Sequence, residues 1–102
     1  MNGHINLAKR IRDEARWCIL RILNAGRPIG VNVPVILRVL EDTHLSCAPD
    51  TLRRELDYLQ DLGLIESDDD HSFGKLTAYG VAVVEYNTPA PAGIARPRQK
   101  AN

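Results

Sequence analysis

The chain has 102 residues, of which 44% are hydrophobic and 25% charged, and its formal net charge is zero. This size and composition are typical of one soluble globular domain with one modest core. No apolar run reaches the ~18 residues that a membrane-spanning helix needs, and the first residues lack the apolar core of a signal peptide. We therefore expect a cytoplasmic protein with no membrane partner.

The zero net charge conceals an uneven distribution of charge. Basic residues predominate in residues 1–30 and 88–102, and acidic residues predominate in residues 31–87. Neutralising phosphates requires Lys and Arg, so the ends of the chain suit nucleic acid better than its centre does.

Apolar residues recur with helical spacing from Leu7 to Leu23, which predicts an amphipathic first helix. Gly26 can adopt the left-handed backbone that often ends a helix, and Pro28 prevents continuation. Residues 29–31 suit a short strand. Asn32 predicts the cap of a second helix, because its side-chain oxygen can accept a hydrogen bond from a first-turn amide.

A turn at residues 44–48 separates the second helix from a third, and Pro49 suits the first position of the latter. In the third helix, leucines predict the buried face and ionisable residues the solvent face. The expected buried residues of the two helices are Ile36, Leu37, Leu40, Leu52, Leu56 and Leu59. The expected outer residues of the third helix are Asp50, Arg53, Arg54, Asp57 and Asp61.

A β-hairpin is predicted next, with strands at residues 64–66 and 75–76 joined by a polar turn. Thr77 can then cap a fourth helix from Ala78 to Tyr86. Residues 81–86 would also suit a strand, because residues 81–84 are rich in β-branched side chains. Helix is favoured, and the strand stays open as the alternative.

From Thr88 onward the sequence has three prolines, one glycine, three positive charges and almost no bulky apolar residues. This composition predicts a flexible basic tail at residues 88–102, following a domain at residues 1–87. The tail cations, Arg96, Arg98 and Lys100, could contact phosphates or a protein partner.

Several strings in this order resemble the winged helix-turn-helix superfamily. Residues 51–59 lead into Leu-Gly-Leu-Ile-Glu at 62–66, and Leu-Thr-Ala-Tyr-Gly follows at 76–80. In that superfamily, a similar glycine corner joins the third helix to the wing, and a similar Leu-Thr string opens the next helix. The resemblance covers residues 8–87. It implies a mainly α fold with a small β-hairpin, namely a three-helix core, a wing and a C-terminal helix.

Shorter strings are similar to a family of small winged-helix proteins of Mu-like phages and prophages. These strings lie at residues 11–16, 19–20, 58–59 and 93–97. The resemblance implies a phage-associated protein, of a kind sometimes classed as a regulator from its fold alone. Fold analogy does not determine function.

If the ligand is double-stranded DNA, the third helix should enter the major groove with its N-terminal half near the base edges. We then expect contacts from Thr51, Arg53 and Arg54, because arginine can bond both acceptors of guanine and threonine can reach a phosphate or a base. Lys75 is the only cation of the predicted wing. The corresponding function is a DNA-binding transcriptional regulator.

Acidic residues favour a different interpretation. The predicted wing tip carries three consecutive aspartates at residues 68–70, which would repel the phosphate backbone. Asp50 lies four residues before Arg54, and Asp57 lies four after Arg53, so both arginines could simply be paired on a solvated helix face. The alternative function is therefore a winged-helix protein-interaction module that has lost DNA binding.

The first and last helices are also expected to carry a homodimer or partner surface. Trp17 lies at the edge of the apolar stripe, where a ring is often completed by another chain. Many winged-helix proteins dimerise through these two helices, and the resemblance implies the same here. The residues expected on this surface are Arg12, Arg16, Trp17, Leu20, Val83 and Tyr86.

No motif predicts catalysis, a metal or a cofactor. His44 and Cys47 form a pair without the second pair that zinc requires. The sequence has no serine elbow and no phosphate-binding glycine loop. Cys18 and Cys47 are too few for a disulfide framework, and we expect both to pack as small apolar side chains.

Overall fold

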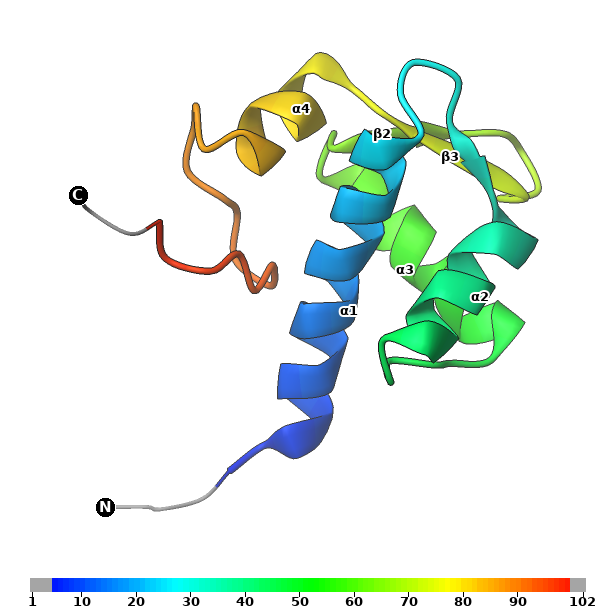
Figure 1. Ribbon diagram of the computed structural model, residues 1–102, viewed down its shortest axis with the longest axis horizontal. Helices are drawn as coiled ribbons and strands as arrows, with labels where there is room; N and C mark the ends of the chain where they lie inside the picture. The colour runs from blue at the N-terminus through cyan, green and yellow to red at the C-terminus, as the bar shows by residue number, and fades with distance from the viewer. Residues whose placement is uncertain (1–4, 100–102) are drawn as a thin grey trace.

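The computed structural model describes residues 5–99, which form a mixed α/β domain of four helices and one three-stranded antiparallel sheet (Figure 1). Among these residues, no helix is both long and apolar enough to cross a membrane. In chain order the elements are α1 (Leu7–Ala25), β1 (Val31–Asn32), α2 (Val33–Asp42), α3 (Pro49–Asp61), β2 (Ile65–Ser67), β3 (Phe73–Leu76) and α4 (Ala78–Val84).

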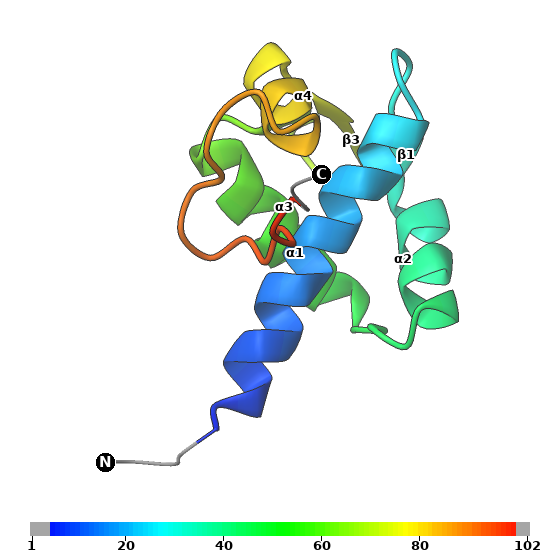
Figure 2. The same cartoon turned by 60° about the vertical axis from the view of Figure 1, so that its left-hand side comes forward.

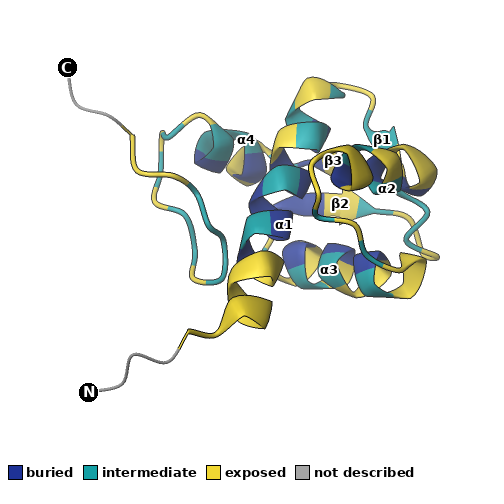
Figure 3. Ribbon diagram, turned by 60° about the horizontal axis from the view of Figure 1, so that its bottom comes forward, coloured by how far each residue is buried: buried dark blue, intermediate teal, exposed yellow. Residues whose placement is uncertain are grey.

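The core lies between α1 and the elements packed around it. α1 contacts α2, α4 and β3. The expected apolar stripes are confirmed for Ile36, Leu40 and all three leucines of α3, which are fully buried. Leu37 is half-buried, and Leu7 and Ile11 at the start of α1 are exposed. Burying one such side chain stabilises the fold by about 1.5–3 kcal/mol. Figure 3 shows α3 with its buried face toward the body and its exposed face outward.

The predicted hairpin forms between β2 and β3, where Ile65 pairs with Leu76 and Ser67 with Gly74. β1 adds a third strand on the other edge of β3, with Val31 opposite Gly74. This close approach requires glycine at position 30, which has φ +105° and where a Cβ atom would lie 2.4 Å from the Phe73 ring.

The prediction for Gly26 was wrong in its reason. The backbone of Gly26 has φ −90°, so the residue does not adopt the left-handed conformation. Glycine is needed there because a Cβ atom would lie 2.4 Å from Cγ2 of Val31. The end of the first helix therefore lies close to β1. Glycine is required at residue 26 because there is no room for a side chain, and its backbone conformation is one that other residues also adopt.

Two caps define the starts of α2 and α4 as the sequence predicts. Asn32 accepts a hydrogen bond from the Val35 amide at 3.1 Å, and Thr77 accepts one from the Gly80 amide at 3.0 Å. Such caps contribute about 0.5–2 kcal/mol each. Residues 81–86 were open to either helix or strand. Residues 81–84 are helical, and α4 ends at Val84, two residues before the predicted end. Tyr86 then adopts φ 63° and turns the chain away.

The expected mobile tail is corrected by the structure. Residues 86–99, here named the C-terminal strap, run back beside α1 instead of projecting away, as Figure 1 and Figure 2 both show. Ala90 and Ile94 pack against the core. The folded unit therefore extends past the predicted boundary at residue 87.

Candidate functional site

The N-terminal half of α3 presents two arginines to solvent. Leu52 and Leu56 face the core, which directs Arg53 and Arg54 outward, and both are exposed. Arg54 donates a hydrogen bond from Nη2 to Oγ1 of Thr51 at 3.3 Å. The structure thus brings together the three α3 residues for which we expected DNA contact.

The ion pairs on this face differ from those expected at i and i+4. Arg53 Nη1 lies 3.5 Å from Oδ1 of Asp50, three residues earlier, while Arg54 is bonded to Thr51. Asp57 instead lies near His71 of the loop between β2 and β3, with 3.4 Å between Oδ1 and Nε2. Exposed pairs of this kind contribute at most about 1 kcal/mol, so they do not fix the arginines in place.

The contact between Asp57 and His71 brings the hairpin loop against α3. A concavity of about 260 Å³ lies between them. Its lining residues are Arg53, Arg54, Asp57, Asp69, Asp70 and His71. The two arginines are therefore close to three carboxylates.

Asp68, the first of the three consecutive aspartates, stabilises the loop between β2 and β3. Asp68 accepts hydrogen bonds from the Ser72 amide at 2.9 Å and from the Ser72 hydroxyl at 2.7 Å. The hydroxyl bond is the main reason why the pKa of Asp68 is lowered from its ordinary value. Lys75, the expected wing cation, is exposed on β3 and pairs across the strands with Glu66.

Arg16 was assigned to a partner surface, and this prediction was wrong because the side chain is only 11% exposed. Its Nε atom lies 2.5 Å from Oε1 of Glu55, and its guanidinium carbon lies 3.8 Å from the centre of the Tyr58 ring. Nη1 lies 3.6 Å from Oδ1 of Asp13 and donates to the carbonyl oxygen of Gly93 at 3.3 Å. Arg16 therefore joins α1, α3 and the C-terminal strap.

The rest of the expected dimer surface is corrected in the same way. Leu20 and Val83 are fully buried, and Trp17 is 8% exposed and packs edge-on against Tyr86 with ring centres 6.2 Å apart. Of the six expected residues, Arg12 alone is exposed. The others pack within the domain because α4 and the C-terminal strap cover this side of α1.

The C-terminal strap is held by hydrogen bonds that all end on backbone carbonyl oxygens, some of its own and some of the residues it lies against. Tyr58 donates to the carbonyl oxygen of Ala92 at 3.2 Å, and the Ala95 amide donates to that of Asp13 at 3.2 Å. Arg96 donates from Nη1 to the carbonyl oxygens of Thr88 at 2.8 Å and Val83 at 2.9 Å. Hydrophobic patterning cannot detect such bonds.

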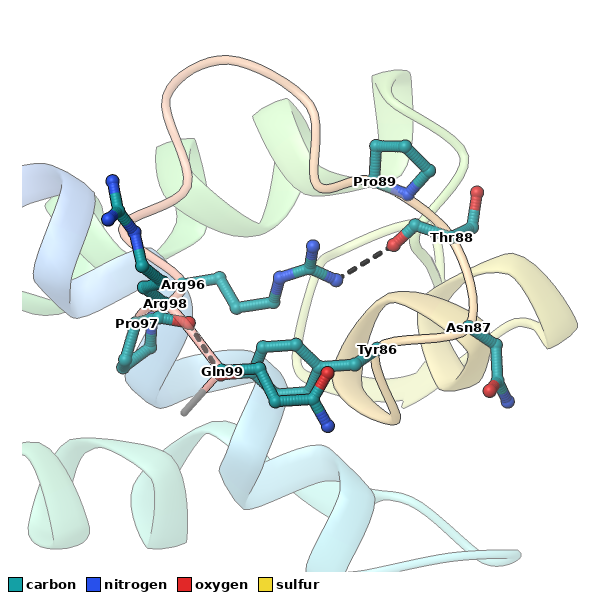
Figure 4. Close-up of a pocket in the computed structure, with 8 residues that line it drawn as sticks. All are labelled: Tyr86, Asn87, Thr88, Pro89, Arg96, Pro97, Arg98 and Gln99. Carbon is teal, nitrogen blue, oxygen red and sulfur yellow. Dashed lines mark hydrogen bonds between the residues drawn. The ribbon is translucent and has the colours of Figure 1, made fainter. Parts of the chain in front are cut away.

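Figure 4 shows the end of the C-terminal strap around Tyr86. The Tyr86 hydroxyl donates to the carbonyl oxygen of Pro97 at 2.7 Å, and the Arg96 guanidinium lies 4.4 Å from the centre of the Tyr86 ring. Of the predicted tail cations, Arg96 is thus engaged internally and Arg98 is exposed. Lys100 lies outside the described residues.

Cys18 and Cys47 are both half-buried and are not bonded to each other. Burial, and to a lesser extent the charge of Glu55, raises the pKa of the Cys47 thiol. Within residues 5–99 no three His, Cys, Asp or Glu side chains are grouped so that they could hold a metal ion.

Comparisons of the chain with protein-family models, with curated proteins and with solved structures found no match.

Proposed function

We propose that this domain is a winged helix-turn-helix that binds duplex DNA through the N-terminal half of α3. The order and contacts of the elements support the fold: α2 and α3 follow one another across a short turn and pack together, and the β2–β3 hairpin follows α3. β1 completes the sheet beside the hairpin. The sequence motifs at residues 51–66 and 76–80 agree with this fold. The short strings that are similar to proteins of Mu-like phages support a further part of the proposal, namely that the protein functions in a phage or prophage.

The observation that carries the function is the exposure of Arg53 and Arg54 in the second turn of α3, beside Thr51. In helix-turn-helix proteins, the N-terminal residues of the motif's second helix, which corresponds to α3 in this proposal, contact the base edges. Each bidentate pair between an arginine and a guanine contributes about 1–3 kcal/mol of discrimination. That exceeds the strength of the exposed pair between Arg53 and Asp50, so DNA could displace it.

The wing should weaken this binding. Asp69 and Asp70 are exposed next to the two arginines, and they would repel phosphates that approach the loop. We therefore propose that binding depends on α3 and that the wing contributes little attraction beyond that of Lys75. The affinity should be modest and should fall as salt is raised.

Fluorescence anisotropy with a labelled random duplex, at low and at physiological salt, tests this proposal. Replacing Arg53 and Arg54 with Ala should weaken binding at least about tenfold, by loss of two charge-assisted contacts. The matched control replaces Arg21 and Arg38 with Ala, which removes the same charge from exposed positions outside α3. Equal losses in the two variants, or no loss in either, would contradict the proposal.

Replacing Asp69 and Asp70 with Asn tests the role assigned to the wing. Removing two negative charges beside the DNA should raise the affinity, most clearly at low salt. An unchanged affinity would place the hairpin loop away from the phosphate backbone.

A second candidate function is a protein-interaction module, and the acidic surroundings of the arginines favour it. Asp50, Asp57, Asp61, Asp69 and Asp70 are all exposed on α3 and the hairpin loop. Such a surface suits a basic protein better than a phosphate backbone. Absence of duplex binding even at low salt would support this candidate over the first.

A further inference from the structure

A groove of about 510 Å³ lies between α1, the turn from α2 to α3, and the start of α3. Ile19 and Leu40 are fully buried and form its floor, while Ile11 and Leu45 line its sides. Ile11 is 45% exposed. Sites for small molecules have volumes of about 300–1,000 Å³ and a mainly apolar lining. The groove is therefore of a suitable size for a small molecule that would cover Ile11.

The apolar part of the lining is aliphatic. None of the residues that line the groove carries an aromatic ring. Cys47 contributes an uncharged thiol, because burial, and to a lesser extent the charge of Glu55, raises its pKa. Aromatic groups gain a specific stacking geometry from other aromatic rings, whereas an aliphatic chain needs only apolar cover. The lining therefore suits an aliphatic chain better than a planar ring.

Two arginines from different helices border the groove, Arg12 of α1 and Arg54 of α3. Within residues 5–99 neither of them forms an ion pair. The arginines that do are Arg10, Arg16, Arg27 and Arg53. Arg54 donates to the hydroxyl of Thr51, an uncharged residue that also lines the groove. Because a guanidinium has five N–H donors, both arginines keep donors for an anion.

The carboxylate in the lining does not neutralise these arginines. Glu55 is the only carboxylate among the residues that line the groove. Its Oε1 atom lies 2.5 Å from Nε of Arg16, so its charge is already paired. The uncompensated charge at the groove is therefore positive. A carboxylate complements it well, because arginine can bind both oxygens of a carboxylate at once.

We propose that this groove binds a small aliphatic carboxylate. The carboxylate group would accept hydrogen bonds from Arg12, Arg54 and the hydroxyl of Thr51. The aliphatic chain would lie over Ile11 and Leu45 and above the buried floor. Both parts of the ligand contribute, since the head offsets two unpaired charges and the chain removes apolar surface from water.

This site goes beyond the proposed function and does not depend on it. Arg54 belongs both to the groove and to the proposed DNA face, so a bound carboxylate would compete with DNA for its guanidinium. The experiments that test the site contain no DNA. Failure of DNA binding and failure of ligand binding are therefore observed separately.

Titration of the full chain with decanoate, followed by amide NMR spectra, tests the site. The amides of Ile11, Leu45, Thr51 and Arg54 should shift saturably, with a dissociation constant of about 1 mM or lower. Decyltrimethylammonium has the same chain and the opposite charge, and it should bind at least about tenfold more weakly. Butyrate keeps the charge but shortens the chain, and it should also bind at least about tenfold more weakly.

The two arginines are tested together. A variant with Arg12→Gln and Arg54→Gln should bind decanoate at least about tenfold more weakly, because it loses both charge-assisted contacts. The matched control carries Arg21→Gln and Arg98→Gln, which removes the same charge from exposed positions outside the groove. Its dissociation constant should stay close to that of the native chain.

The aliphatic contact has its own pair of variants. Ile11→Asn should weaken decanoate binding at least about threefold, since it removes apolar cover for the chain. The matched control is Ile29→Asn, which changes an equally apolar residue that is 78% exposed in the loop before β1. Circular dichroism confirms that each variant is folded.

The proposal fails if decanoate causes no saturable shifts, or if it binds no better than decyltrimethylammonium, which would show non-specific adsorption. It also fails if the two double-arginine variants bind decanoate equally well. Shifts of the Ile11 and Leu45 amides that depend on protein concentration without decanoate would show that a second copy covers the groove, and would overturn it. Saturable binding that is lost only in the groove variants would support it.

Discussion

Arg16 and Arg53 have identical side chains and opposite surroundings. The side chain of Arg16 is 11% exposed and contacts Glu55, Tyr58 and the C-terminal strap, whereas that of Arg53 is 44% exposed and forms an ion pair with the exposed carboxylate of Asp50. Both occupy amphipathic helices in a chain of zero net charge. The comparison shows that an arginine becomes structural when distant segments supply its partners, and stays available to a ligand when they do not.

The largest effect in this comparison is expected from Arg16→Met against Arg53→Met. Removing Arg16 leaves the carboxylate of Glu55, whose side chain is only 14% exposed, without its partner, which should lower the free energy of unfolding by about 3 kcal/mol. The same change at Arg53 should cost less than about 0.5 kcal/mol. Urea unfolding followed by Trp17 fluorescence measures both. Similar losses in the two variants would show that Arg16 contributes no more than a surface arginine.

A smaller effect is expected from Gly93→Ala, with Gly63→Ala as its control. Both glycines have positive φ, +87° and +79°. A Cβ atom at residue 93 would also lie 2.6 Å from the Tyr58 hydroxyl and 2.9 Å from Nη1 of Arg16. We expect a loss of about 2–3 kcal/mol at Gly93 and about 1 kcal/mol at Gly63.

Thermal unfolding of both alanine variants checks this difference. The nearest atom to a Cβ at Gly63 is Cδ2 of Tyr79 at 4.0 Å, so backbone strain acts there without a clash. An equal loss at the two positions would mean that the C-terminal strap moves aside at no cost. It would then contribute little to stability.

The smallest effect concerns the hairpin loop, which is closed by an exposed carboxylate rather than by buried groups. Bonds from Ser72 lower the pKa of Asp68 below its ordinary 3.8. The stabilisation is therefore complete above the ordinary pKa and is lost as the pH falls through the lowered value. The Ser72 amide resonance in an NMR titration should move with a midpoint below 3.8. Asp68→Asn should abolish this movement, and a midpoint at or above 3.8 would contradict the assignment.

Local signals in the sequence predicted most of the framework. The leucine stripe of α3 and the caps at Asn32 and Thr77 depend on neighbours within one or two helical turns, so their consequences are readable from spacing alone. The same reasoning placed Arg53 and Arg54 on the outer face. Interpretation of the fold as a winged helix remains a proposal supported by these elements.

Contacts between distant segments could not be predicted in this way. Arg16 meets Glu55 across 39 positions, and its hydrogen bond to Gly93 spans 77. Leu20 and Val83 were placed on a surface because helical spacing marks an apolar face without saying what covers it. The C-terminal strap was missed because a segment rich in proline and alanine binds here through hydrogen bonds to backbone carbonyl oxygens, which every residue possesses.

The position of the C-terminal strap at the end of the domain also affects the order in which contacts form during synthesis. Residue 16 leaves the ribosome long before residue 93, so nascent α1 and α3 can pack their leucines while the guanidinium of Arg16 still lacks its last acceptor. A contact between residues so far apart forms late, because the intervening chain must first be ordered. Translation is expected to yield first a loosened domain, which closes only when the strap emerges and docks.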